Sequence, residues 1–340
     1  MKAQSAAVIG GGIGGLTTAN TLVRAGWHVT VYERSPGLPA TGTALGLWLP
    51  ARRALARIGV EQALAAIGVE QRAGEIRRWD GTVLGRAGSG RAAVLLISRP
   101  ELTRVLAEAL PPGVLRLGEP APPLADLAEH DVIIGADGIG SRTRASLFGE
   151  RSAPRSLRMT AWRGWVPGEA ATTSESWGPG ALFGITPRDG GLTNWFAAVR
   201  TPAAADPSLE ALRTRYRGWH PAVQDVLRRV DEESMLVHEL LETPRLPAYV
   251  RGRVALLGDA AHAMSPNLGR GACEAIVDAV VLGEELARHP VPLALRRYDR
   301  RRRLPDTAIA RASRVMGRVA TATSGTGLRD AALGITMRLA

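Results

Sequence analysis

A glycine-rich loop between two apolar stretches carries the first chemical signal of the chain. Gly10, Gly12 and Gly15 have the spacing Gly-x-Gly-x-x-Gly, and Glu33 closes the next apolar stretch. Glycines at this spacing permit a tight turn, close approach of the backbone to a pyrophosphate, and close packing of a helix on a strand. The first amides of that helix attract phosphate, and a carboxylate at Glu33 accepts from ribose hydroxyls. The pattern predicts a dinucleotide site; the alternative is a glycine-rich turn without a ligand.

An acidic turn follows a second apolar stretch near the middle of the chain. Residues 131–134 read Asp-Val-Ile-Ile, and Asp137 and Gly138 follow closely. A buried strand that delivers Asp-Gly into a tight loop is compatible with a second nucleotide contact. An aspartate that only caps the end of the strand explains the same pattern equally well.

A third apolar stretch, 253–257, ends in Gly258 and Asp259. Asp259 is suited to bond polyol hydroxyls, and the N-terminus of the helix expected over about 270–287 stabilises negative charge on a ring. His262 is a weak candidate for a general base, although a histidine in such a position is more often structural.

These loops need a sheet to position them, and the chain supplies strands and helices in alternation. Residues 6–9, a helix to about residue 25 and residues 28–33 form a βαβ unit. From about 155 to 248 the pattern of residue types changes: apolar and polar residues alternate in short stretches separated by Gly and Pro turns. This stretch is expected to form a separate, mostly antiparallel layer. His220 and His238 lie in it without any feature that marks either as a phenol-activating base.

Composition excludes several classes of function. The net charge is +11, but the arginines are scattered and no nucleic-acid reader motif accompanies them, so no nucleic-acid partner is expected. The run 296–303 is interpreted as a solvated helix face. Lys2 is the only lysine, which removes Schiff-base chemistry inside the fold, and Cys273 is the only cysteine, which removes an internal disulfide. No apolar run is long enough to span a membrane and no secretion signal is apparent, so a cytoplasmic protein is expected.

In this order, the three loops resemble those of the class A, single-component FAD-dependent aromatic hydroxylases. The likeness runs from residue 5 to about 315 and is nearest to the branch with salicylate hydroxylase-like, urate hydroxylase-like and zeaxanthin epoxidase-like enzymes. It implies an α/β fold: a Rossmann-like FAD-binding domain of the glutathione-reductase type, an inserted antiparallel β-sheet substrate domain as in para-hydroxybenzoate hydroxylase, and C-terminal helices. The implied division is 1–73, 92–154 and 250–290 for FAD, 74–91 and 155–249 for the substrate layer, and 291–340 for the helical segment.

The resemblance also implies roles for single residues. FAD would be held by Gly10, Gly12, Gly14, Gly15, Glu33, Arg34, Gly46, Arg99, Asp137, Asp259, Gly269, Arg270 and Gly271. The substrate pocket would include Trp162, Phe183, Trp195, Phe196 and Pro266. No catalytic side chain is assignable, because the flavin carries the chemistry; His262 and Arg270 are weak candidates.

The implied activity is monooxygenation in aromatic catabolism or secondary metabolism. NAD(P)H would reduce FAD transiently, and O2 would add to give a C4a-hydroperoxide that hydroxylates an aromatic or polycyclic substrate. A monomer or homodimer is expected. Epoxidation, Baeyer–Villiger oxidation, and oxidase or dehydrogenase activity on the same fold stay open, whereas a halogenase is excluded because it needs a lysine between flavin and substrate.

Two departures from the family pattern stand out. The segment 118–129 is short and rich in Pro and Ala where the family usually has a β-meander, so the cover of the adenine side and the retention of FAD are in question. Arg270 stands where the family often has glutamine. It would either strengthen binding of the anionic reduced flavin or point to solvent.

Overall fold

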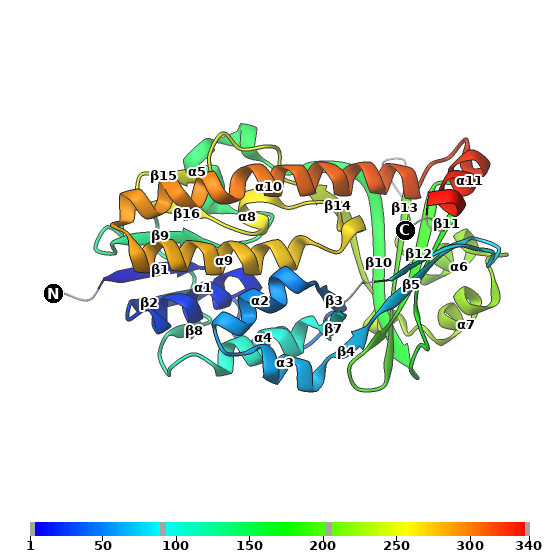
Figure 1. The fold of residues 1–340 in the computed structure, drawn as a ribbon, viewed down its shortest axis with the longest axis horizontal. Coiled ribbons are helices and arrows are strands. Elements are labelled where there is room, and N and C mark those ends of the chain that lie inside the picture. Colours follow the sequence, from blue (N-terminus) through cyan, green and yellow to red (C-terminus); the bar gives the residue numbers. More distant parts are fainter. Residues whose placement is uncertain (1–3, 89–92, 201–205, 337–340) are drawn as a thin grey trace.

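The computed structural model describes residues 4–88, 93–200 and 206–336, and Figure 1 shows two large sheets toward opposite ends of an elongated molecule. The first sheet has six strands in the order β15-β16-β9-β1-β2-β8, all parallel except the pair β15–β16. Its strands are β1 (Ser5–Ile9), β2 (His28–Glu33), β8 (Leu115–Leu117), β9 (Val132–Gly135), β15 (Val250–Arg251) and β16 (Val254–Leu256).

This topology gathers the three loops found in the sequence. β1, β9 and β16 are neighbours in parallel register, and their carboxyl ends lead into Gly10, Asp137 and Gly258. Ligands of open parallel sheets bind outside the carboxyl ends of the strands, where such loops meet. Residues far apart in the chain therefore share one edge of the sheet.

Helices cover both faces of this sheet, which explains why its central strands are apolar throughout. A small antiparallel sheet adjoins it, in the order β3-β7-β4. The helices here are α1 (Ile13–Arg24), α2 (Leu49–Arg57), α3 (Glu61–Ile67), α4 (Arg99–Glu108), α5 (Arg142–Phe148), α8 (Asp259–His262) and α9 (Gly271–Arg288); the small sheet has β3 (Ala44–Leu47), β4 (Val69–Gln71) and β7 (Val94–Ser98).

The second large sheet has seven strands in the order β14-β10-β13-β12-β11-β5-β6. One of its faces packs on two short helices, and the other face is turned toward the first sheet (Figure 1). Its strands are β5 (Ala73–Arg78), β6 (Val83–Gly88), β10 (Arg155–Pro167), β11 (Thr173–Gly178), β12 (Ala181–Arg188), β13 (Leu192–Arg200) and β14 (Leu236–Glu242); the helices are α6 (Leu209–Arg215) and α7 (Pro221–Arg229).

A long helix, α10 (Val291–Ala320), runs beside α9 and reaches the second sheet, where α11 (Thr326–Thr336) follows it (Figure 1). The interpretation of 296–303 as a wholly solvated face is wrong for Arg302, which is only 8% exposed. Three short 3-10 turns complete the described elements: η1 (Glu150–Ser152), η2 (Glu232–Ser234) and η3 (Pro266–Leu268).

The predicted fold class is confirmed, with a parallel Rossmann-type sheet, an antiparallel sheet and C-terminal helices. No strand forms between Leu117 and Val132, all of which the structure describes, so a β-meander is absent at this point. Over the described ranges, none of the helices is both long and apolar enough to cross a membrane. The domain boundaries given above stay predictions.

Candidate active site

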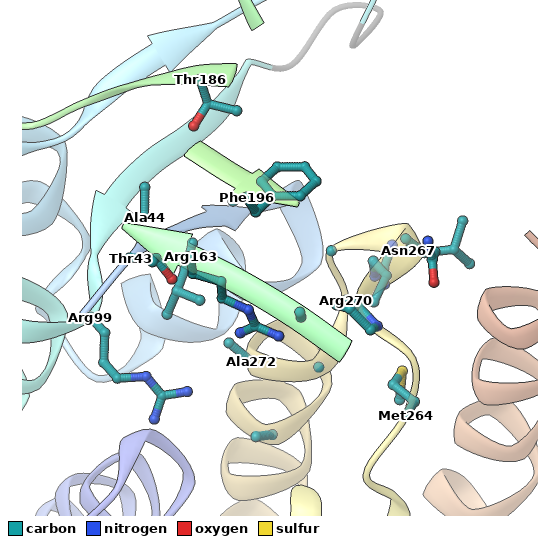
Figure 2. Close-up of a pocket in the computed structure, with 18 of the residues that line it drawn as sticks. Thr43, Ala44, Arg99, Arg163, Thr186, Phe196, Met264, Asn267, Arg270 and Ala272 are labelled. Atoms are coloured by element: carbon teal, nitrogen blue, oxygen red, sulfur yellow. The ribbon is translucent and has the colours of Figure 1, made fainter. Parts of the chain in front are cut away.

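A cavity of about 760 Å³ lies between the loops of the first sheet and one face of the second sheet. Figure 2 shows Arg99, Arg163 and Arg270 reaching it from α4, from β10 and from the start of α9. Of the sequence-predicted residues, the lining includes Gly12, Gly14, Gly46, Arg99, Asp259, Pro266, Gly269, Arg270, Gly271 and Phe196.

The glycine-rich loop is built as its spacing predicts. Gly10 has a φ of +105°, and a Cβ on Gly15 would lie 1.9 Å from the carbonyl oxygen of Gly10, so only glycine fits at these two positions. Gly12 instead faces open space and would tolerate a Cβ. α1 begins there without a side-chain cap and without an acidic residue in its first turn, which leaves its first amides available for an anion.

Glu33 lies at the end of β2 beside this loop. Its Oε2 accepts from the Gly11 amide at 2.7 Å and its Oε1 accepts from the Ser35 amide at 2.8 Å. These bonds orient the carboxylate next to the expected phosphate position. Arg34 is exposed and, like Glu33, is not among the residues that line the cavity.

The carboxylate of Asp137 is engaged within its own loop. It accepts from the Ser141 hydroxyl at 2.5 Å and from the Thr143 amide and hydroxyl, each at 3.0 Å. Only its neighbours Ala136, Gly138 and Ile139 line the cavity. The capping alternative therefore accounts for the bonds that this carboxylate makes to described residues, and its contact with FAD stays a prediction.

Arg144 connects two of the loops, a role that the sequence did not reveal. The residue is 2% exposed and donates to the carbonyl oxygens of Ile139, Ser152 and Ala260. It thereby ties the loop after β9 to the loop after β16. No local pattern marks this role, because the carbonyl acceptors come together only in the folded chain.

The loop after β16 presents Asp259 to the cavity. Gly258 has a φ of +57°, and Asp259 is exposed, with no hydrogen bond from any described residue to its carboxylate. α9 starts beside it, again without a side-chain cap. Arg270 lies at that start, lines the cavity and pairs with the buried Glu274 at 2.5 Å, so a side chain that simply points to solvent does not describe it. Its contact with a flavin stays a prediction.

His262 does not reach the cavity, which contradicts its candidacy as a base. It is 5% exposed, and its Nε2 lies 2.6 Å from Asp278 and 3.5 Å from Asp306. Arg302 bonds both carboxylates, at 2.6 Å and 2.5 Å. Burial opposes a charge on His262, but the two carboxylates outweigh it and raise its pKa to about 9. His262 is part of a buried ionic cluster under the loop.

Arg99 and Arg163 carry the unpaired positive charge of the cavity. Neither side chain has a hydrogen bond or ion pair with a described residue. Burial lowers the pKa of Arg163, Arg99 lowers it further and Asp259 opposes the fall, which places the guanidinium within electrostatic reach of both. Arg163 was missed in the sequence because one arginine among 43 basic residues has no local signature.

The second sheet offers a mixed surface to the cavity. Register places Arg163, Phe196, Gly184 and Glu175 in one row across β10, β13, β12 and β11. A Cβ on Gly184 would lie 2.0 Å from Cζ of Phe196, so the Phe196 ring lies over this glycine, flat along the sheet. Of the two histidines left open by the sequence, His238 lines the cavity and His220 bonds Ser176 in a buried position outside it.

Three of the five residues expected in the substrate pocket lie elsewhere. Trp162, Phe183 and Trp195 are buried in the cluster that the sheet forms with α6 and α7. Their side chains alternate with those of Arg163 and Phe196, and successive residues of a strand point to opposite faces. The expectation is therefore wrong for these three, whereas Phe196 and Pro266 do line the cavity.

Two family models match the chain. The model described as "FAD binding domain" matches residues 129–313, and the one described as "FAD dependent oxidoreductase" matches residues 5–141. The matched ranges include all three loops at the edge of the first sheet.

Characterised relatives match over most of their length. The chain is 35% identical to aurachin C monooxygenase/isomerase of Stigmatella aurantiaca, over 86% of this chain and 83% of that protein. It is 34% identical to 3-amino-4-hydroxybenzoate 2-monooxygenase PtnB3 of Streptomyces platensis, over 92% and 87%. Among solved structures, Klebsiella pneumoniae HpxO with FAD and uric acid superposes with a TM-score of 0.87 at 24% identity, covering 99% of this chain and 93% of that one. At that identity the likeness concerns the fold.

Proposed function

Because this chain belongs to the FAD-dependent aromatic monooxygenases, we propose that it hydroxylates an aromatic small molecule, with NAD(P)H as electron donor and O2 as oxygen source. The observation that supports this proposal most is a single cavity of about 760 Å³, which the cofactor and the substrate would share. One of its walls is made of the three nucleotide loops. The other is a sheet face with Phe196 and with Arg163, which pairs with none of the described residues. A cofactor and a substrate in this space would contact each other directly.

The residues present fit FAD. The amides at the start of α1 and the open space at Gly12 suit a pyrophosphate, and the free carboxylate of Asp259 suits the hydroxyls of a ribityl chain. Arg99 offers a guanidinium without a partner among the described residues. We propose that these groups hold the cofactor, together with Gly46 and 269–271.

When bound, FAD accepts electrons from NAD(P)H and activates O2 for transfer of one oxygen atom to the substrate. The chain's own groups bind, orient and exclude water. The Phe196 ring and the apolar neighbours Leu182 and Leu240 keep the sheet side of the cavity dry, while Arg163 supplies positive charge close to Asp259. A developing negative charge on oxygen is stabilised most by such a fixed charge in a site with little water.

We propose an electron-rich aromatic substrate with an anionic or readily ionised group that Arg163 binds. The guanidinium is desolvated, and Asp259 acts on it electrostatically without forming an ion pair, so a ligand anion would be its first direct partner among the described groups. The relative from Streptomyces platensis is named for a substrate of this kind, an aminohydroxybenzoate.

The test is a screen of the FAD-reconstituted protein with NADH and NADPH over a panel of phenols, hydroxybenzoates and polycyclic aromatics. Stimulated oxidation of NAD(P)H by at least one compound, with formation of a hydroxylated product, is the expected outcome. A protein that binds no FAD, or that oxidises NAD(P)H at one rate whatever the compound, contradicts the proposal.

We further propose a cytoplasmic protein that is a monomer or a homodimer. A reduced pyridine nucleotide as donor and a single, buried cysteine support a reducing compartment. Light scattering on the reconstituted protein tests the oligomeric state, and a mass above that of two chains contradicts it.

A further inference from the structure

We propose that Glu175 contacts the substrate and selects aromatic compounds that present a hydrogen-bond donor, an amino or hydroxyl group, toward β11. The inference rests on the proposed function, because it assigns the far end of the same cavity. This contact would determine which substrates bind, in addition to the contact with an anionic group proposed for Arg163.

Glu175 is placed on the cavity by strand register. It pairs with Gly184 of β12 on one side and with Ile76 of β5 on the other, in the row that begins at Arg163. Strands lie about 4.8 Å apart, so three strand spacings put the Cα atoms of Arg163 and Glu175 about 14 Å from each other. Side chains that lean inward from those two positions flank a space of the size of an aromatic ring system.

One carboxylate oxygen of Glu175 is held and the other is available. Trp177, which is 2% exposed, donates its indole N–H to Oε1 at 2.5 Å and so fixes the orientation of the carboxyl group. Within the part of the chain that the structure describes, no hydrogen bond or ion pair reaches Oε2. Glu175 lines the cavity, so this oxygen has an approach for a ligand.

The surroundings of Glu175 supply no countercharge from the described residues. Burial raises the pKa of Glu175 to about 7, and the Trp177 bond opposes the rise only in part. No cation contributes to this pKa, unlike the neighbouring Glu75, which pairs with Arg77 and Arg86. Ionisation of this buried carboxyl group is costly, and a ligand N–H or O–H that donates to Oε2 stabilises the ionised form and offsets that cost.

An aromatic side chain, Phe196, covers the sheet surface between Arg163 and Glu175. The ring of Phe196 lies over Gly184, between the strands of Arg163 and Glu175, because a glycine at 184 leaves room for it. A planar substrate stacked on this ring would have one edge toward Arg163 and the opposite edge toward Glu175. Asp259 is the other acidic residue of the described lining and lies on the cofactor side, so a metal site at Glu175 is not supported.

The experiment compares ligands that differ by one donor. Isothermal titration calorimetry on the FAD-loaded protein would measure the affinities of 3-amino-4-hydroxybenzoate and 4-hydroxybenzoate, and of 4-hydroxyquinoline and quinoline. The variants are Glu175→Gln, which keeps the shape, and Glu175→Met, which removes the acceptor. The control is Glu75→Gln, since Glu75 pairs with Arg77 and Arg86 and does not line the cavity.

We expect the wild type to bind the donor-bearing member of at least one pair about tenfold more tightly or better, as a charge-assisted hydrogen bond provides. Glu175→Gln should reduce this preference, Glu175→Met should abolish it, and Glu75→Gln should keep it. A wild type that discriminates in neither pair, or a preference that survives Glu175→Met, overturns the inference. If that happens while FAD is retained and some aromatic compound is hydroxylated, the proposed function stands and only the role of Glu175 fails.

Discussion

Nε2 of His262 lies 2.6 Å from Oδ2 of Asp278, and the same oxygen accepts the Gly258 amide at 3.0 Å. One carboxylate on α9 thus holds both ends of the short turn that presents Asp259 to the cavity. Arg302 of α10 bonds the other oxygen of Asp278 at 2.6 Å, so the long C-terminal helix also contributes to the position of the turn.

The cluster makes stability depend on pH in the alkaline range. The pKa of His262 is raised to about 9 by Asp278 and Asp306 against the effect of burial, and burial with Asp278 raises the pKa of Asp306 to about 8. Both groups bind protons more tightly in the folded state. Stability from His262 is therefore complete below its unfolded pKa of about 6.5 and is lost as pH rises through about 9.

We expect the unfolding temperature to fall between pH 6.5 and pH 9, by about 1–2 °C for each kcal/mol lost from a chain of 340 residues. Thermal unfolding followed by circular dichroism at several pH values measures this slope. His262→Gln should flatten it, and an equal slope in wild type and variant would contradict the assignment.

Arg302→Met should destabilise the fold by about 3–5 kcal/mol, because it leaves Asp278, Asp306 and Glu274 buried without their shared cation. Urea unfolding of the FAD-free protein gives the free energy. Arg301→Met is the matched control one residue away: Arg301 is 47% exposed, and its pair with Glu285 is expected to contribute less than about 1 kcal/mol. Equal decreases in the free energy of unfolding of the two variants would show that the buried cluster contributes no more than an exposed ion pair.

Gly12→Ala should weaken FAD binding without destabilising the empty protein. A Cβ at Gly12 meets no protein atom within 4 Å, and it would occupy the space assigned to the pyrophosphate. Overpacking of about 1–3 kcal/mol corresponds to a loss of about 5- to 150-fold in affinity. Fluorescence titration of the FAD-free protein measures it, with Gly37→Ala as control because that glycine also faces open space but lies away from the cavity. Unchanged FAD affinity in Gly12→Ala would refute the placement.

Arg163→Met should lower the affinity for anionic aromatics by about tenfold or more, since it removes a charge-assisted contact, and should leave a neutral analogue nearly unaffected. The comparison is between 4-hydroxybenzoate and its methyl ester, titrated into FAD-loaded protein. Arg155→Met, an exposed position on the same strand, is the control. If the affinities for the acid and for the ester fall by the same factor, Arg163 maintains the structure of the pocket and does not recognise the carboxylate.

The nucleotide loops could be predicted from the sequence because their requirements are local. Gly10 and Gly15 need a turn and a close approach within a few residues, and Asp259 follows its strand directly. Local signals for strands, turns and helices therefore predict most of the part of the fold around the parallel sheet. The short Pro- and Ala-rich segment 118–129 likewise predicts that no meander precedes β9.

The substrate side could not be predicted in the same way. Trp162 and Arg163 are adjacent in the chain but point to opposite faces of one strand, and only the packing of α6 and α7 decides which face is core. The aromatic character of Trp162 and Trp195 suggests a substrate pocket, but both side chains belong to the hydrophobic core between the sheet and α6 and α7. Arg163, Glu175 and the Arg302 cluster depend on contacts between residues far apart in sequence, so no local pattern marks them.

Oxygen transfer is the central claim, and an ¹⁸O₂ experiment tests it most directly. The FAD-reconstituted protein would be incubated with NAD(P)H, ¹⁸O₂ and the compound that stimulates NAD(P)H oxidation most, and the product analysed by mass spectrometry. One ¹⁸O atom per product molecule, with one NAD(P)H and one O2 consumed for each, is the predicted result. A product that carries no label, with the oxygen recovered as hydrogen peroxide, would show an oxidase and contradict the account.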